Sequence, residues 1–222
     1  MRFVAAHFPL AEAAVVGGST STGTRTATSD IDLLLLGPPA MLDGDDSRAA
    51  TWSFEGEAIE VFAYAEHGFE RWAARGVEQC RPVIVDMLVR GTAVRDGALL
   101  DALRARWAPI LAQGPSVDAH RINLLRYAVT DLVDDLRDAE DPFERHVTMA
   151  CLLEQVAALA LLSNGRWLGS GKHLARQLRK WSPDRAAALA EPFVAGDAPG
   201  FLRAAERELD RAGGRLREGF VR

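Results

Sequence analysis

The stretch Gly17–Leu36 has the sequence GGSTSTGTRTATSDIDLLLL and is the most informative segment of the 222-residue chain. A strand candidate, Glu12–Val16, precedes it, and the stretch itself ends in the apolar run Ile31–Leu36. Because this run is apolar on both faces, it predicts a central strand that is covered on both sides of a sheet. The stretch therefore predicts a short strand, a glycine-rich bend and a spacer, followed by a buried strand.

Two aspartates open the second strand. Asp30 and Asp32 are two residues apart, so in a strand their side chains project from the same face, about 6–7 Å apart along the backbone. Two neighbouring carboxylates repel each other unless a cation lies between them, and hard oxygen ligands favour Mg²⁺. The competing interpretation is a pair of turn or cap acids that precede a strand.

A third acid follows in the next strand candidate. Glu60 lies in the segment Ile59-Glu60-Val61-Phe62, between apolar neighbours in a strand pattern. A carboxylate would be costly in an apolar core, and it is favourable beside a cation. We therefore predict that Asp30, Asp32 and Glu60 are metal ligands.

The bend before the spacer is the candidate phosphate-binding element. Gly18 and Ser19 end the first strand in a backbone loop that can approach a phosphate and offer N–H groups to it. The glycines of this segment can also be read as ordinary turn residues.

The remaining pattern predicts two domains. In the first half we expect a mobile loop, a hairpin with its turn at Glu55-Gly56-Glu57, several helices and a last short strand; the ranges are 37–50, 51–64, 69–79, 82–90, 92–94 and 99–111. After Pro115 only helical periodicity remains; the expected helices are 118–138, 141–163, 172–181, 183–194 and 199–212. The fold class expected is an α/β (α+β) domain with a small mixed sheet over 1–112, followed by an all-helical bundle over 115–222.

These residues closely resemble the DNA polymerase beta-like nucleotidyltransferase superfamily. Within it, the likeness is greatest to small proteins of the aminoglycoside nucleotidyltransferase type and to minimal nucleotidyltransferase (MNT) domains. The family pattern is a Gly-Ser pair, a spacer, a strand with paired acids and a third acid on the next strand, and all parts occur here in order. The resemblance covers residues 12–64 well and 65–112 loosely, and beyond that it is a general likeness of a helical bundle after a catalytic domain.

The resemblance implies a role for each residue of the pattern. Gly18 and Ser19 would hold a nucleoside triphosphate, Asp30 and Asp32 would bind two Mg²⁺ ions, and Glu60 would complete the site and help to deprotonate the attacking hydroxyl. The reaction would be an in-line attack on the α-phosphate, with pyrophosphate as the leaving group.

The second half contains three further candidates. Glu154 is a candidate general base by resemblance to aminoglycoside-type enzymes, or else a buried acid paired with an arginine. Lys172 leads a basic stretch, 166–180, that holds five Lys or Arg and no acid, and it would contact the triphosphate unless the stretch is an ordinary solvated face. An acidic ridge on the helix 118–138 would receive a polycationic antibiotic, or else it is simply solvated; its residues are Asp131, Asp134, Asp135 and Asp138.

Composition limits the partners. The formal charge is −5, and residues 1–110 carry 10 Lys and Arg against 15 Asp and Glu, so no bulk attraction to long nucleic acid or anionic lipid is expected. The longest apolar run, 147–162, is short for a membrane span and contains Glu154. We therefore expect a cytoplasmic protein without a membrane partner, and a homodimer is one assembly that these observations allow.

The expected function is Mg²⁺-dependent transfer of a nucleoside monophosphate, with AMP from ATP favoured, to a hydroxyl of a small-molecule or protein acceptor. An aminoglycoside-like antibiotic is the specific acceptor that the resemblance suggests. Two alternatives remain at this point: an MNT-type antitoxin or regulatory module that binds a partner protein, and an enzyme that transfers AMP to a protein. The sequence leaves the acceptor and the nucleobase open.

Overall fold

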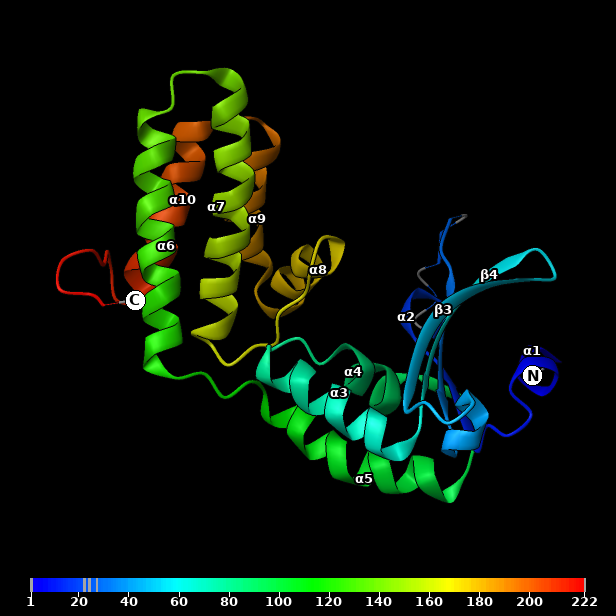
Figure 1. Cartoon of the computed structure of the whole chain (residues 1–222). Helices are drawn as coiled ribbons and strands as arrows, with labels where there is room; N and C mark the ends of the chain where they lie inside the picture. Colours follow the sequence, from blue (N-terminus) through cyan, green and yellow to red (C-terminus); the bar gives the residue numbers. More distant parts are fainter. Residues whose placement is uncertain (1, 22, 24, 27, 222) are drawn as a thin grey trace. The chain divides into compact units, whose positions relative to one another are not determined.

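The computed structural model describes residues 2–21, 23, 25–26 and 28–221. The chain divides into two compact units, Met1–Gln113 and Gly114–Arg222. The division falls between the two expected domain limits, 112 and 115. All strands of the described residues belong to the first unit, and the second is helical (Figure 1).

The first unit is built on one five-stranded mixed sheet with the strand order β3-β4-β2-β1-β5. The strands are β1 (Ala13–Val16), β2 (Ile31–Leu36), β3 (Ser47–Phe54), β4 (Glu57–Tyr64) and β5 (Thr92–Arg95). Strand β2 runs parallel to β4, whereas the other three pairings are antiparallel. The small mixed sheet confirms the expected fold class.

Strand β2 lies in the middle of the sheet, and its last four residues, Leu33–Leu36, are buried. This confirms the prediction of a strand that is covered on both faces. The expected hairpin is also present, as β3 and β4. Its two turn residues, Glu55 and Gly56, have φ angles of 53° and 85°, as the tight turns between twisted strands require. Glu57 begins β4 and is not a turn residue.

The helices of the first unit correct two expectations. They are α1 (Arg2–His7), α2 (Gly18–Ser21), the 3₁₀ helix η1 (Pro39–Leu42), α3 (Glu66–Glu78), α4 (Val83–Arg90) and α5 (Ala98–Gln113). The segment 37–50, expected to be a mobile loop, contains η1 and the start of β3. It is held because Met41 and Leu42 are buried in the core beside the sheet. The bend at Gly18 and Ser19 begins a single helical turn instead of an open loop.

The second unit is a helical bundle, as predicted. Its helices are α6 (Ala119–Asp138), α7 (Pro142–Leu162), α8 (Lys172–Trp181), α9 (Pro183–Val194) and α10 (Ala198–Arg211). Helices α6, α7, α9 and α10 surround one apolar core. The side chain of Asp141 accepts hydrogen bonds from the backbone N–H groups of Phe143 and Glu144, which confirms it as the N-cap of α7.

Helix α7 is not buried on all sides, although its sequence is apolar nearly all round. It has the length and mean hydropathy of a membrane-spanning helix, but Leu152, Val156 and Leu159 are fully buried in the core of the bundle. In contrast, Phe143 is 76% exposed and Val147 is 48% exposed. We interpret α7 as a core helix with one open face toward its N-terminal end.

Candidate active site

The register of the two parallel strands brings two of the predicted acids together. Asp32 on β2 lies directly opposite Glu60 on β4. Residues opposite each other in neighbouring strands project from the same face of a sheet, and neighbouring strands are about 4.8 Å apart. Both side chains are only partly buried. The prediction that Glu60 faces the same side as Asp32 is therefore consistent with the register.

The electrostatics of Glu60 show that the third acid is also near. Burial raises the pKa of the Glu60 carboxyl above its usual value, and the negative charges of Asp32 and Asp30 raise it further. Asp30 directly precedes β2 and is partly buried. The three carboxylates thus form one mutually repelling group at the start of β2 and in the middle of β4.

Gly18 is packed against this group. Its φ angle is +58°, and a Cβ atom on Gly18 would lie 1.7 Å from Oδ2 of Asp32. The neighbouring backbone is also tied to β2, because the Gly17 N–H donates a 2.9 Å hydrogen bond to the backbone carbonyl of Asp32. Only glycine allows the bend to lie this close to the carboxylate. The predicted glycine bend and the predicted acid strand are therefore in direct contact.

The short helix α2 contains an unsatisfied hydroxyl that sequence reasoning missed. Among the residues that the structure describes, Thr20 Oγ1 is the buried side-chain oxygen or nitrogen without a hydrogen-bond partner. Such a group costs about 1–3 kcal/mol when it is left unpaired. Its neighbour Ser19 belongs to the same helical turn, but the Ser19 side chain lies outside the described part, so its phosphate contact stays a prediction.

Arg25 was also missed, although it is the one base within the spacer 19–29. Its guanidinium donates hydrogen bonds of 3.2 Å and 3.1 Å to the Ser29 carbonyl and a further one to the Glu57 carboxylate on β4. The hydrogen bond to Glu57 raises the pKa of Arg25, and the negative charges of Glu57 and Asp30 also raise it. Arg25 therefore ties the end of the spacer to β4, close to Asp30.

The donor chemistry of the site fits a divalent cation. Asp30, Asp32 and Glu60 supply hard carboxylate oxygens, and their mutual repulsion is the condition that a cation relieves. Within residues 2–21, 23, 25–26 and 28–221, however, no three Asp, Glu, His or Cys side chains are gathered closely enough to form a ready-made metal cluster. The three acids are thus brought together by strand register and electrostatic coupling, but they do not form a complete set of metal ligands.

The structure places both candidates of the second unit, Glu154 and Lys172, on the surface. Glu154 is exposed on α7 and has no ion pair among the described residues, so the interpretation as a buried acid paired with an arginine is wrong. Lys172 is the first residue of α8 and is exposed. Their roles as general base and triphosphate contact stay predictions, because both belong to the second compact unit.

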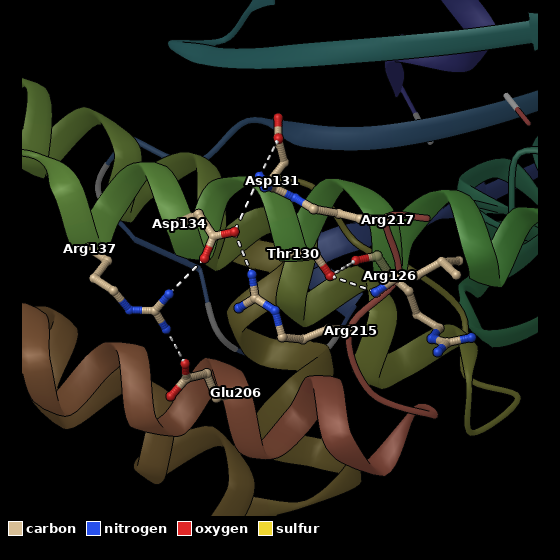
Figure 2. A network of polar contacts seen from close by, with 9 residues as sticks. Arg126, Thr130, Asp131, Asp134, Arg137, Glu206, Arg215 and Arg217 are labelled. Atoms are coloured by element: carbon tan, nitrogen blue, oxygen red, sulfur yellow. Dashed lines mark hydrogen bonds and ion pairs between the residues drawn. The ribbon is translucent and has the colours of Figure 1, made fainter. Parts of the chain in front are cut away.

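The acidic ridge on α6 is partly occupied by the chain's own arginines. Figure 2 shows Arg215 and Arg217, from the C-terminal segment 212–221, beside α6. Asp134 accepts hydrogen bonds from Arg137 at 2.7 Å and from Arg215, and Arg217 approaches both Asp131 and Asp134 to 3.2 Å. The expected receptor for a polycationic antibiotic is therefore not an open surface at these two aspartates.

Contacts other than ion pairs also hold the same segment. The Leu216 N–H donates a 3.1 Å hydrogen bond to Thr130 Oγ1, and Arg126 donates to the backbone carbonyls of Gly213 and Gly214. Phe220 packs beside the Tyr127 ring, with 5.9 Å between ring centroids. The C-terminal segment is thus a strap along α6 that combines backbone, aromatic and charged contacts.

The strap is expected to weaken in acid. Burial alone would raise the pKa of Asp134, but the hydrogen bond from Arg215 and the charges of Arg215, Arg217 and Arg137 outweigh it, so the pKa lies below its usual value. A lowered pKa stabilises the fold fully above the unfolded-state value of about 3.9, and this stabilisation is lost as the pH falls through the folded-state pKa. Asp134→Asn should reproduce this loss at neutral pH.

The measurement is the rate of trypsin cleavage after Arg215 and Arg217 at neutral pH. We expect faster cleavage in Asp134→Asn than in the wild type. Asp135→Asn is the matched control, because Asp135 is the next residue of α6 and has no ion pair in the part of the chain that the structure describes. Equal cleavage rates in Asp134→Asn and Asp135→Asn would contradict the role of Asp134.

A comparison with known protein families covers the site. Residues 2–97 match a family model described as a nucleotidyltransferase domain. Among solved structures, the chain is similar to a nucleotidyltransferase-like protein from Exiguobacterium sibiricum 255-15, with 13% sequence identity and a TM-score of 0.49. That alignment covers 95% of this chain and 72% of the other. The comparison with curated proteins finds no match.

The matched range contains the whole site of the first unit. It includes the bend at Gly18, the paired acids Asp30 and Asp32, and Glu60 on the neighbouring strand. Over residues 2–97 the first unit is therefore similar to a nucleotidyltransferase domain.

Proposed function

We propose that this protein transfers AMP from ATP to a hydroxyl of a small-molecule or protein acceptor in an Mg²⁺-dependent reaction. The observation that carries the proposal is the register that pairs Asp32 with Glu60, with Gly18 packed against the Asp32 carboxylate. An aminoglycoside-like antibiotic is the first acceptor to test. The acidic balance of the first 110 residues supports an acceptor other than a long nucleic acid.

In this proposal the acids divide the chemistry between them. Asp30, Asp32 and Glu60 would hold the cation, which when bound neutralises phosphate charge and stabilises the oxygens of the attacking and leaving groups. Glu60 is the residue suited to accept the proton of the acceptor hydroxyl, because burial and the charges of Asp32 and Asp30 raise its pKa above the usual value for a glutamate. Glu154 is the second candidate for this role, on the resemblance alone.

The bend would hold the triphosphate. Gly18 and Ser19 would offer backbone N–H groups, and the unpaired hydroxyl of Thr20 would donate to a phosphate oxygen. Hydrogen bonds to charged groups contribute about 1.5–3 kcal/mol, so a phosphate would offset the cost of the buried Thr20 oxygen. Lys172 is proposed as a further triphosphate contact from the second unit.

Thr20→Val is expected to separate nucleotide binding from stability. Removing an unsatisfied hydroxyl should leave the free energy of unfolding unchanged or slightly higher, since valine has nearly the shape of threonine. The dissociation constant for ATP should rise by roughly tenfold or more, which corresponds to one lost hydrogen bond to a charged group. Denaturant unfolding and ATP titration of the same samples measure both quantities.

Thr20→Ser is the matched control, because it keeps the hydroxyl and removes only the methyl group. It should bind ATP nearly as well as the wild type. If Thr20→Val and Thr20→Ser bind ATP equally well, the hydroxyl does not contact the nucleotide.

The function is tested by incubation with each α-labelled nucleoside triphosphate and Mg²⁺, against a panel of hydroxylated antibiotics and candidate acceptor proteins. Label transfer and pyrophosphate release are measured together. Asp32→Asn should abolish both while the protein stays folded. Asp101→Asn, an exposed acid on α5 of the same unit, is the matched control and should remain active.

The outcomes also distinguish the alternatives. Label on an antibiotic supports the small-molecule acceptor, and label on a protein supports protein modification. Binding of ATP without pyrophosphate release, together with tight binding to a partner protein, would favour the antitoxin-type module. Equal activity of Asp32→Asn and the wild type would contradict the assignment of the site.

A further inference from the structure

The second unit contains an acidic groove that is lined by both acidic and apolar residues. The groove has a volume of about 490 Å³ and lies where α6 ends and α7 begins; its lining residues are Asp135, Asp138, Ala139, Phe143, Glu144, Val147 and Thr148. Three of these residues are acids, and Phe143 and Val147 are the exposed apolar residues on the open face of α7. Unlike Asp131 and Asp134, none of the three acids has an ion pair among the described residues.

Two of the three acids lie where the dipole of α6 disfavours a negative charge. Asp135 and Asp138 lie in the last turn of this helix, where the helix dipole is negative and acidic side chains are unfavourable. Stability of the isolated unit therefore does not explain these two aspartates. A cationic partner would explain them, because it would neutralise their charge.

The same unit presents an unpaired basic surface. Lys172, Arg176, Arg179 and Lys180 are exposed on α8 and, in the part of the chain that the structure describes, have no ion pair. The first turn of α8 contains no acid, so Lys172 lies where the helix dipole is positive. Lys172 is thus placed against the dipole of its own helix, whereas Arg179 and Lys180 lie in the last turn, where the dipole favours a cation.

The two surfaces cannot neutralise each other within one unit. The groove lies at the N-terminal end of α7, whereas α8 follows the C-terminal end of α7 and packs against α7 and α9 (Figure 1). Helix α7 has 21 residues, so it is about 30 Å long. That distance is several times the Debye length in physiological salt, about 8 Å. A second copy of the chain can bring the two surfaces together.

We propose that two copies of this chain associate through their helical units, with α8 of each copy against the acidic groove of the other. Because the groove and α8 lie at opposite ends of α7, two copies that run in opposite directions make the same contact twice, and the assembly closes as a dimer. Arg176, Arg179 and Lys180 of α8 pair with Asp135, Asp138 and Glu144. Phe143 and Val147 are covered in the process. The proposal is independent of the proposed function.

The test is the mass of the full-length protein, measured by sedimentation and by light scattering at low ionic strength. We expect a dimer that dissociates in about 1 M salt, where the Debye length falls to about 3 Å. A wild type that stays monomeric at low ionic strength and high protein concentration would overturn the proposal. A mass that increases beyond two copies with concentration would overturn the closed arrangement.

Charge variants test which surfaces meet. One variant reverses the charge of the groove with Asp135→Lys and Asp138→Lys. The other reverses the charge of α8 with Arg176→Glu and Lys180→Glu. Each variant should be monomeric alone. A mixture of the two should contain a heterodimer, because the groove variant supplies a normal α8 and the helix variant supplies a normal groove. A chain with all four substitutions should dimerise again.

Circular dichroism melting of every variant distinguishes lost association from lost folding. The substitutions are on exposed positions, so the melting temperature of each monomeric variant should be close to that of the wild type in high salt. If both variants are folded and still dimeric, or if the mixture stays monomeric, the groove and α8 are not the two halves of an interface.

Discussion

Gly18→Ala should reduce kcat/KM for nucleotidyl transfer by at least about 100-fold, because displacement of a catalytic group by about 1 Å has an effect of this size. The Cβ atom of alanine would lie 1.7 Å from Oδ2 of Asp32, so the carboxylate or the bend must move. Gly18 is exposed, and the damage should therefore stay local. Steady-state kinetics and a thermal melt of the variant measure the two effects.

Gly23→Ala is the matched control for backbone conformation. Gly23 also has a left-handed φ, +69°, but nothing lies within 4 Å of the position that its Cβ would occupy. Both variants pay the same backbone cost of about 1–2 kcal/mol for an alanine in this region. Only Gly18→Ala should lose activity, and equal losses in both would show that strain, and not contact with Asp32, is responsible.

Glu208→Leu should be the most destabilising single substitution in the helical unit that we predict. Glu208 on α10 is 3% exposed and accepts hydrogen bonds from Arg185 Nε at 3.1 Å and 3.0 Å, and others from Arg185 and Arg211. Removing one partner of a buried ion pair costs about 3–5 kcal/mol, because the other charge is left unpaired. The melting temperature of the unit should fall by more than about 10 °C.

Two controls identify the unpaired charge as the cause. Arg185→Met combined with Glu208→Leu should recover much of the stability, since replacing both members of a buried pair by apolar residues is often neutral. Glu206→Gln removes a half-exposed acid of the same helix, α10, that pairs with Arg137 of α6, and it should cost about 1 kcal/mol or less. Hydrogen exchange in α9 and α10 reports on the helical unit separately. A double variant no more stable than Glu208→Leu would contradict the explanation.

Local patterns predicted most of the secondary structure. The run Leu33–Leu36 is apolar at every position, and it forms the fully covered strand that this pattern indicates. Asp141 followed by a proline predicted the start of α7, because a side-chain cap acts on the two or three residues that follow it. The segment 37–50 was wrongly predicted to be a mobile loop, since the burial of Met41 and Leu42 depends on distant parts of the chain.

Part of the candidate site was predicted, because that part also depends on local sequence. The paired acids Asp30 and Asp32 and the glycine bend are adjacent in sequence, so their chemistry is visible there. Thr20 and Arg25 were missed, because an unpaired hydroxyl and a contact with Glu57 are seen only after folding.

By itself, the sequence determined which residues can do chemistry and which segments form strands and helices, because both depend on residue type and on neighbours a few positions away. Tertiary structure decided that Asp32 lies opposite Glu60, that Asp131 and Asp134 are bound by arginines about 80 positions away, and that one face of α7 is open. These properties follow from strand register and helix packing, which join segments far apart in the chain and leave no local pattern to read.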